Sequence, residues 1–262
     1  MFDNVLHDKV VLITGSTYGV GLATAEAMGR AGAKMVFING RNVDAGNAAA
    51  ETLRTKAPDT HFHFLRADMN ALGDIEMLFT KVKSVGGGLD VFVHCGYGGG
   101  AAHPPNIFTN QTPAIYSATV HAVLMSLIHC CHFAAPLLIE RGGGSIIGIA
   151  SDAAKVPTPG ESVHGAALAG AVMFLRTLAR ELGRHKIRVN GVTPSLIRDT
   201  RNYETVMNGG FSQKLFQSIE KRALLGVPGP ENLAPLITFL SSQYASHITG
   251  QIVSVNGGIS GA

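Results

Sequence analysis

The sequence predicts one α/β domain: a doubly wound parallel sheet of seven strands with helices on both faces. Short apolar, β-branched runs alternate with helix-period segments from end to end, and no linker or internal repeat divides them. A chain of 262 residues with 46% hydrophobic residues can also fill a sizeable core. The predicted strands are residues 9–14, 34–39, 61–67, 90–94, 145–150, 188–193 and 251–255.

Composition and charge exclude several classes of protein. No run approaches the roughly 18 uninterrupted apolar residues of a membrane span, and the N-terminal region lacks the pattern of a signal peptide. A net charge of +3 without Lys/Arg runs, and the absence of tryptophan, give no surface for nucleic acid. Cys95, Cys130 and Cys131 lack metal-type spacing, so we expect buried thiols. The sequence therefore predicts a soluble, cytoplasmic protein that binds neither membranes nor nucleic acid.

The first predicted strand leads into TGSTYGVG, a glycine-rich turn that opens an amphipathic helix. Glycines at this spacing let backbone N–H groups approach a pyrophosphate, and the helix N-terminus supplies a partial positive charge. A tight strand-to-helix turn alone would also use glycines, but the following second strand favours dinucleotide binding. The expected cofactor residues of this loop are Gly15, Ser16, Thr17, Gly19, Val20 and Gly21.

The end of the second strand predicts which dinucleotide binds. An adenosine ribose with a free 2′-OH is usually held by an acidic side chain here, whereas a 2′-phosphate needs an arginine. The chain has Gly40 and Arg41 at this place. We therefore expect NADP(H), with NAD(H) as the alternative if Arg41 is only a solvated turn residue.

These motifs resemble those of the short-chain dehydrogenase/reductase family, over essentially the whole chain. TGSTYGVG is similar to the family's TGxxxGxG loop, GGGSIIGIAS to the strand that ends in its catalytic serine, RVNGVTPS to its RVNxVxPG strand, and ITGQIVSVNGG to its closing strand. The resemblance implies binding of NAD(H) or NADP(H), assembly as dimers or tetramers through two long helices, and hydride transfer between the nicotinamide and a carbonyl or alcohol. It also extends the cofactor site to Asp68, Met69, Gly96, Pro194 and Ile197.

The catalytic residues of the family are mostly missing. Its reaction uses a serine, a tyrosine, a lysine four residues after the tyrosine, and an asparagine on the preceding long helix. Ser151 matches the serine, whereas His164 stands at the tyrosine position and Leu168 at the lysine position. No asparagine occurs between Asn110 and Asn190, so the fourth residue is missing as well.

Other departures affect the nicotinamide side. The segment that usually reads NNAG after the fourth strand is HCGY here, and Tyr97 replaces a glycine that lets backbone approach the ribose. The usual PG after the sixth strand has become Pro194 and Ser195. Lys155 is the only lysine between Lys83 and Lys186, on a loop after the serine strand.

Two hypotheses follow. In the first, His164 replaces the tyrosine as acid or base, because an imidazole with a pKa near 6.5 needs no lysine to exchange protons at neutral pH; the reaction is then reductive, or redox-neutral with a structural nucleotide. In the second, the chain is a catalytically silent subunit that supports an active sibling in a hetero-oligomer. A lone histidine at a helix start is also often only a capping or packing residue. Asp152 and Glu161 are nearby carboxylates that can orient His164.

Two further groups complete the prediction. His121, His129 and His132 lie on one predicted helix, but they lack acidic companions at zinc-like spacing, so we expect an interface or core feature and no metal site. Residues 198–229 form a polar, glycine-containing stretch after the sixth strand, and we expect two short helices that cover the carboxyl ends of the strands as a substrate lid. The apolar side chains that indicate a partly apolar substrate pocket, or pack the lid, are Phe108, Phe211, Leu215 and Phe216.

Overall fold

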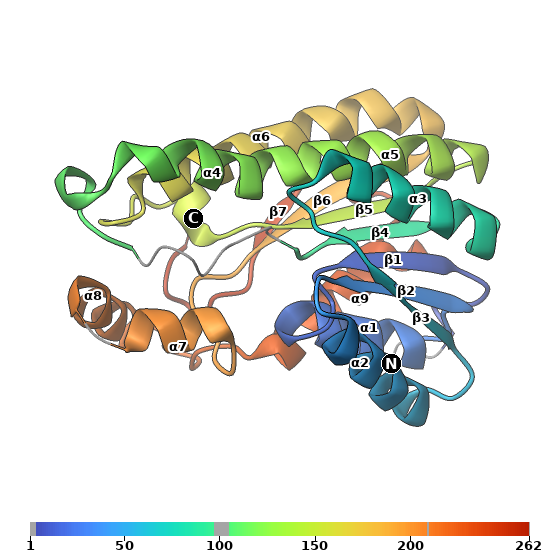
Figure 1. Cartoon of the computed structure of the whole chain (residues 1–262), viewed down its shortest axis with the longest axis horizontal. Coiled ribbons are helices and arrows are strands. Elements are labelled where there is room, and N and C mark those ends of the chain that lie inside the picture. The colour runs from blue at the N-terminus through green and yellow to red at the C-terminus, as the bar shows by residue number, and fades with distance from the viewer. Residues whose placement is uncertain (1–3, 97–104, 209, 262) are drawn as a thin grey trace.

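The computed structural model describes residues 4–96, 105–208 and 210–261. Seven strands form one parallel sheet in the order β3-β2-β1-β4-β5-β6-β7 (Figure 1). The predicted seven-stranded, doubly wound sheet is thus confirmed, and the single domain with it. The strands are β1 (Val10–Thr14), β2 (Met35–Gly40), β3 (His61–Arg66), β4 (Val91–His94), β5 (Gly144–Ile149), β6 (Ile187–Thr193) and β7 (Ile252–Ser254).

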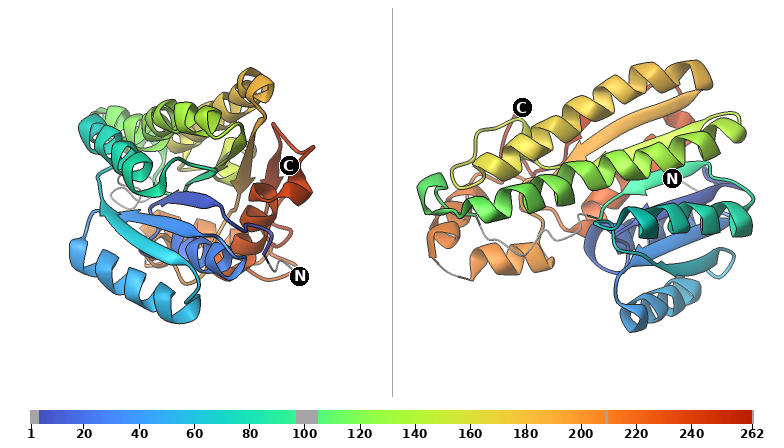
Figure 2. Two further views of the ribbon diagram at one scale, coloured as in Figure 1. Left: turned by 90° about the vertical axis from the view of Figure 1, so that its right-hand side faces the viewer. Right: turned by 45° about the horizontal axis from the view of Figure 1, so that its top comes forward.

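Helices cover both faces of the sheet. On one face lie α1 (Gly19–Arg30), α2 (Val43–Lys56) and α9 (Pro230–Ser241), and on the other lie α3 (Leu72–Gly86), α5 (Ser126–Glu140) and α6 (Ser162–Leu182) (Figures 1 and 2). Successive residues of a strand face opposite layers. In β1, Leu12 packs in the core under α3 and α5, and Ile13 packs in the core under α1 and α9. Burial on both sides is the reason that the strands read as continuous apolar runs.

Two helical stretches, Pro113–Glu140 and Ser162–His185, are long and apolar enough to cross a membrane by length and composition. Both instead bury one side in the sheet layers, through residues such as Leu138 in the first and Leu175 in the second. Core helices of an α/β domain pass the same test, so these stretches are explained by the fold. The first stretch is built from η2 (Pro113–Ile115), α4 (Tyr116–Val120), the π-helical turn η3 (His121–Met125) and α5.

The chain leaves the sheet at its carboxyl edge after β6. There α7 (Arg201–Met207) and α8 (Gly210–Glu220) lie apart from both helix layers, across from α4 (Figure 1). The two short helices expected between residues 198 and 229 are therefore present. They share a small core of their own, which includes Leu196, Val206 and Phe216. The remaining short helices are η1 (Phe108–Asn110), η4 (Asp152–Ala154), η5 (Gly183–His185) and η6 (Gln243–Ala245).

A buried carboxylate ties the amino ends of the central strands together. Asp90 precedes β4, its side chain is 9% exposed, and its Oδ2 accepts hydrogen bonds from the backbone N–H of Val10 at 2.8 Å and from Nη2 of Arg141 at 2.9 Å. A carboxylate shielded from water leaves costly unpaired donors when it is removed.

We expect Asp90→Ala to lower the free energy of unfolding by about 2 to 4 kcal/mol in urea denaturation, since a buried N–H and Arg141 lose their acceptor. Lys83→Ala is the control, because Lys83 and its partner Glu140 are both more than half exposed; such pairs contribute about 0 to 1 kcal/mol. Equal effects of the two substitutions would contradict this role of Asp90.

Candidate functional site

The turn between β1 and α1 is a cradle that only glycines can form. Gly15 and Gly19 have φ angles of 61° and 57°, in the left-handed region that glycine favours. A Cβ on Gly21 would lie 2.4 Å from the carbonyl oxygen of Gly15, and a Cβ on Gly15 would lie 2.5 Å from the Cα of Gly96. The loop after β1 therefore packs backbone against backbone on the loop after β4.

Hydrogen bonds with Asn39 of β2 fix the glycine loop in place. Ser16 is fully buried; its hydroxyl donates to the carbonyl of Ile13 at 2.6 Å and accepts from the N–H of Asn39 at 2.9 Å. The side-chain oxygen of Asn39 accepts from the N–H of Gly15 at 3.2 Å. Asn39 was not predicted as a site residue, because nothing in its sequence context shows where its amide points.

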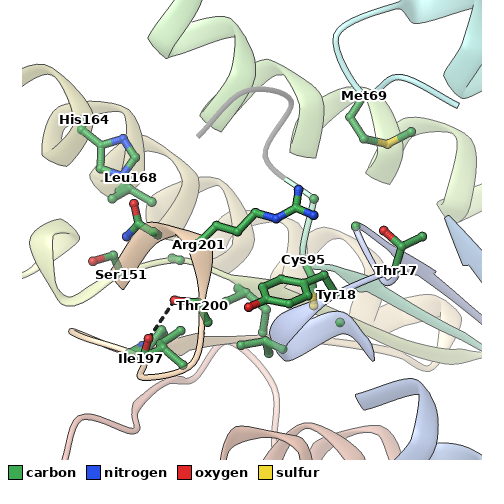
Figure 3. A pocket seen from close by; sticks show the side chains of 18 of the residues that line it. Thr17, Tyr18, Met69, Cys95, Ser151, His164, Leu168, Ile197, Thr200 and Arg201 are labelled. Atoms are coloured by element: carbon green, nitrogen blue, oxygen red, sulfur yellow. Dashed lines mark hydrogen bonds between the residues drawn. The ribbon is translucent and has the colours of Figure 1, made fainter. Parts of the chain in front are cut away.

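One cavity of about 500 Å³ runs along the carboxyl edge of the sheet. All the residues predicted for the site line it except Ser16, which lies buried beneath the loop, and Gly19. The predicted residues in its wall are Gly15, Thr17, Val20, Gly21, Arg41, Asp68, Met69, Gly96, Ser151, His164, Pro194 and Ile197. Figure 3 shows Ser151, His164 and Leu168 together at one end, with Thr17 and Met69 at the other.

At the carboxyl end of β2, the cavity wall has the cation Arg41 and no carboxylate from that strand end. A Cβ on Gly40 would lie 2.7 Å from the Cγ2 of Thr17, so the packing of the loop favours glycine at this position. The side chain of Arg41 is 61% exposed, and its Nη1 lies 4.0 Å from the Oδ2 of Asp68. This loose contact leaves the guanidinium accessible to an anion in the cavity.

At the opposite end, Ser151 follows β5 and His164 lies in the first turn of α6. The Ser151 hydroxyl oxygen accepts from the N–H of Ala153 at 3.3 Å. Burial lowers the pKa of His164, which favours the neutral imidazole. Leu168, one turn further on, is 0% exposed and packs with Ala167 and Val172. A packing residue therefore occupies the place where a lysine was expected.

Lys155, the lysine that follows the serine strand, does not replace the missing one. Lys155 donates from Nζ to the Ser254 hydroxyl at 2.5 Å and lies 3.9 Å from Asp152, and neither charged side chain lines the cavity. Asp152 also accepts from Asn256 and from Ser260, at 2.5 and 2.9 Å. Asp152 is thus bound to the C-terminal segment and does not orient His164.

Glu161 is the other carboxylate considered from the sequence, and it does line the cavity. It precedes α6, and its backbone carbonyl accepts from the N–H of Gly165 at 2.6 Å. Burial raises the pKa of its carboxyl to about 7. Of the two carboxylates, only Glu161 shares a wall with Ser151 and His164.

A buried histidine joins the loops beneath the cavity. Burial lowers the pKa of His94 to about 3, so the ring is neutral. Its Nδ1 lies 3.0 Å from the Thr14 hydroxyl and its Nε2 lies 3.3 Å from the Ser126 hydroxyl. Because Ser126 donates to the carbonyl of Ala122 at 2.6 Å, its oxygen accepts from Nε2–H. His94 therefore connects β1 and β4 to the start of α5, next to Gly96.

The segment of residues 198–229 contacts the glycine loop through two side chains that the sequence did not single out. The Tyr18 hydroxyl donates to the carbonyl of Asp199 at 3.1 Å, and the Cζ of Arg201 lies 5.1 Å from the centre of the Tyr18 ring. Figure 3 shows Arg201 extended over this ring. Both residues line the cavity. Pairing between α7 and the loop is a tertiary contact, which no local motif reveals.

The remaining candidates fall outside the cavity or within its apolar wall. Tyr97 lies outside the described residues. Phe216 lines the cavity, whereas Phe108 stacks on Tyr116 with ring centres 5.8 Å apart. Cys95 also lines it, and burial raises the pKa of its thiol to about 12. All three cysteines are free thiols; Cys130 and Cys131 are buried as expected, whereas Cys95 is partly exposed.

The histidine cluster lies on the α4–α5 stretch. The rings of His121 and His129 lie 6.0 Å apart, and the Nε2 of His121 contacts the carbonyl of Asn70 at 3.1 Å. Among the residues that the structure describes, no three His, Cys, Asp or Glu side chains are grouped to hold a metal ion.

Comparison with known proteins decides the family. A family model described as enoyl-(acyl carrier protein) reductase matches residues 15–260. Dehydrogenase/reductase SDR family member 4 of Homo sapiens is 30% identical over 257 residues, which cover 97% of this chain and 88% of the relative. The chain is a member of the short-chain dehydrogenase/reductase family.

Solved structures of short-chain dehydrogenases/reductases have the same fold. L-sorbose reductase from Gluconobacter frateurii, complexed with NADPH and L-sorbose, is 28% identical with a TM-score of 0.88 and coverage of 99% of each chain. A 7α-hydroxysteroid dehydrogenase, complexed with NADH and 7-oxo glycochenodeoxycholic acid, is 28% identical with a TM-score of 0.87, covering 98% of this chain and 96% of that one. Structural relatives thus bind either nucleotide. The chain has His164 and Leu168 at the two positions where the family resemblance led us to expect a tyrosine and a lysine.

We expect Gly21→Ala to weaken NADPH binding at least tenfold in a calorimetric titration, because the added Cβ would lie 2.4 Å from the Gly15 oxygen and displace the cradle. Gly73→Ala is the control, since a Cβ there meets nothing within 4 Å. If both variants bind NADPH like the parent chain, the cradle does not hold the nucleotide.

Proposed function

We propose that this chain is an NADP(H)-dependent oxidoreductase that acts on a carbonyl or alcohol group of a small molecule. The observation that carries the proposal is the continuity of one cavity, whose wall includes the glycine cradle and Arg41 as well as Ser151 and His164. A dinucleotide extended along this cavity would place its two halves at chemically different ends. The proposal rests on family membership for the reaction type and on the cavity wall for the residues.

The residues present fit the nucleotide. The cradle at Gly15 and Gly21, which side chains would fill, leaves backbone N–H groups for the pyrophosphate, and Arg41 suits a 2′-phosphate. Asp68 and Met69 would border the adenine, while Gly96, Pro194 and Ile197 would border the nicotinamide half, with the remaining loop residues beside the phosphates. The nicotinamide, when bound, supplies or accepts a hydride at the substrate carbon.

Arg41→Ala should weaken binding of NADPH about 10- to 100-fold and leave binding of NADH nearly unchanged, because only NADPH carries the phosphate that pairs with the guanidinium. Calorimetric titration of both nucleotides measures this. The control is Arg184→Ala, an exposed arginine in η5. Equal losses for the two nucleotides would contradict the preference for NADP(H).

Ser151 and His164 would manage the proton. The Ser151 hydroxyl can donate to the substrate oxygen while its own oxygen accepts from Ala153. The neutral imidazole of His164 would accept a proton from an alcohol during oxidation, and the imidazolium so formed would return that proton to the developing alkoxide during reduction. Because Leu168 is buried and uncharged, no ammonium group at that position would assist the transfer.

His164→Ala should lower kcat for NADPH-dependent reduction by about 100-fold or more, the usual contribution of a positioned acid or base. The assay follows NADPH absorbance against a panel of aliphatic and aromatic ketones and aldehydes. His247→Ala, an exposed histidine near the C-terminus, is the matched control and should retain full activity. Retained turnover in His164→Ala, with an unchanged melting temperature, would sink this assignment.

One observation favours a second candidate function. Leu168 completes an apolar cluster with Val123 and Val172, so the lysine position has been absorbed into the core. A catalytically silent subunit that supports an active sibling in a hetero-oligomer needs a packed fold at this position and no lysine. Binding of NADPH without turnover on any carbonyl, together with co-purification of a second family member that has the tyrosine and lysine, would favour it. A redox-neutral reaction at His164 would show substrate turnover without nucleotide consumption.

The proposal also covers the localisation, the assembly and the substrate lid of the protein. We infer a soluble cytoplasmic protein that assembles as a homo- or hetero-oligomer, a dimer or tetramer, and binds neither membranes nor nucleic acid. Residues 198–229 act as the substrate lid in this account. Supporting observations are the contact of Tyr18 with Asp199 and the stacking of Arg201 on Tyr18, which would close the lid over the nucleotide. The partly apolar wall, with Phe216 and Ile219, suits a partly apolar substrate.

A further inference from the structure

The proton that a reduction consumes needs a source, and His164 alone is a poor one. Burial favours its neutral form, and a neutral imidazole is a very weak acid unless its other nitrogen is protonated as the first proton leaves. A second group that holds a proton beside the ring would solve this. Lys155 does not qualify, because it is engaged with Asp152 and Ser254 outside the cavity wall.

Glu161 has the required position. It occupies the N-cap position of α6 without a capping hydrogen bond from its side chain, and its backbone carbonyl accepts the first hydrogen bond of the helix, from the N–H of Gly165, so Glu161 lies three residues before His164 at the start of the helix. Residues three apart at a helix start share a face, and both side chains line the same cavity as Ser151. Among the ion pairs of the described residues, none involves Glu161. Its partly buried carboxyl therefore lies at the reacting end of the cavity without an ion-pair partner among the described residues to hold it ionised.

We propose that Glu161 is the proton reservoir of this site and delivers its proton through His164 to the substrate oxygen beside Ser151. This inference rests on the proposed function. It adds to that function a residue, and a proton route, that replace the missing lysine.

The step balances in protons and electrons. In reduction, the Glu161 O–H bond breaks as its proton goes to one ring nitrogen of His164, and the other ring nitrogen releases its proton to the substrate oxygen. The imidazole ends neutral with its proton on the opposite nitrogen, and the hydride at carbon comes from the reduced nicotinamide nucleotide. The carboxylate left on Glu161 takes a proton from water, and oxidation reverses each transfer.

The charge state of Glu161 suits this role. Burial raises its pKa to about 7, so at neutral pH the carboxyl both holds and releases a proton. Several elements that pack against α6 carry ionisable groups: Asp152 in η4 and Lys155 directly after it, Tyr116 in α4, His121 in η3, His129, Cys130, Cys131, His132 and Glu140 in α5, Arg184 and His185 in η5, and Arg188 in β6. Arg201 in α7 lines the cavity as well. The opposite charges of Asp152 and Lys155 lie 3.9 Å apart and largely cancel, so burial is the main cause of the raised pKa of Glu161.

A first test needs no substrate. Because the pKa of Glu161 rises from 4.5 to about 7 on folding, this group stabilises the fold below pH 4.5, and that stabilisation is lost as the pH rises through about 7. Glu161→Gln stays neutral, so its melting temperature should match that of the parent chain near pH 4.5 and exceed it increasingly towards pH 8. Glu181→Gln, an exposed carboxylate at the far end of α6, should show no such trend. A pH-independent difference for Glu161→Gln would overturn the proposal.

A second test uses turnover. With the best carbonyl compound of the ketone and aldehyde panel, kcat of the parent chain should fall as the pH rises through about 7, as Glu161 loses its proton. Glu161→Gln should lower kcat about 100-fold, abolish that pH dependence and change KM little. A raised KM with unchanged kcat would instead assign Glu161 to substrate binding and overturn the relay.

The two proposals fail separately. Calorimetric titration of Glu161→Gln with NADPH should give the affinity of the parent chain, because Glu161 lies at the reacting end, away from Arg41. If neither protein binds NADPH, the proposed function fails. If both bind it and kcat is unaffected by the substitution, the proposed function stands and the role of Glu161 is refuted.

Discussion

The close approach of Gly15 to Gly96 is the constraint on which the site depends. With a hypothetical Cβ on Gly15 only 2.5 Å from the Cα of Gly96, the loops after β1 and β4 can meet only as bare backbone. These strands are neighbours at the point where the order of the sheet reverses, and the crevice of an open α/β sheet opens there. Asn39 from β2 and His94 from β4 fix the two loops by hydrogen bonds from beneath. The packing of Gly15 on Gly96 therefore positions the cavity wall between Arg41 and Ser151.

Much of this arrangement can be read from the sequence, for physical reasons. Parallel strands buried on both faces give unbroken apolar runs, so all seven strands were predicted close to their observed bounds. The glycine spacing after β1 has few structural solutions, and the two short helices after β6 were predictable because residues 198–229 break the apolar pattern of the chain. Where geometry is local and repetitive, composition and spacing predict it.

The parts that escaped prediction depend on contacts between distant segments. Ser16 was predicted to contact the cofactor from the glycine loop, yet its hydroxyl donates to the carbonyl of Ile13 and accepts from the N–H of Asn39. From the sequence, Asp152 and Glu161 were equal candidates as partners of His164. Only the fold distinguishes them, because Asp152 accepts hydrogen bonds from Asn256 and Ser260 instead. The stacking of Arg201 on Tyr18 joins residues 183 positions apart in the chain, which no motif spans.

Burial sets the charge at the reacting end of the cavity. Without a lysine at position 168, no cation at that position favours an ionised acid, and burial lowers the pKa of His164 and raises that of Glu161. Both groups are thereby biased towards their neutral forms, which suits proton exchange between them better than a fixed ion pair does. The start of α6 therefore faces the cavity with the carboxyl of Glu161, just before the helix, and the imidazole of His164 in its first turn, while Leu168 in the next turn belongs to the core.

The central claim is that one nucleotide extends from Arg41 to the end of the cavity that holds Ser151 and His164. The emission of the reduced nicotinamide tests it most directly, and a chain without tryptophan does not interfere with that signal. On titration of the protein with NADPH, the account predicts saturable binding with enhanced, blue-shifted nicotinamide emission, because the ring leaves water for a partly apolar wall. Saturable binding heat with unchanged emission would mean that only the adenine half is held, and would contradict the account.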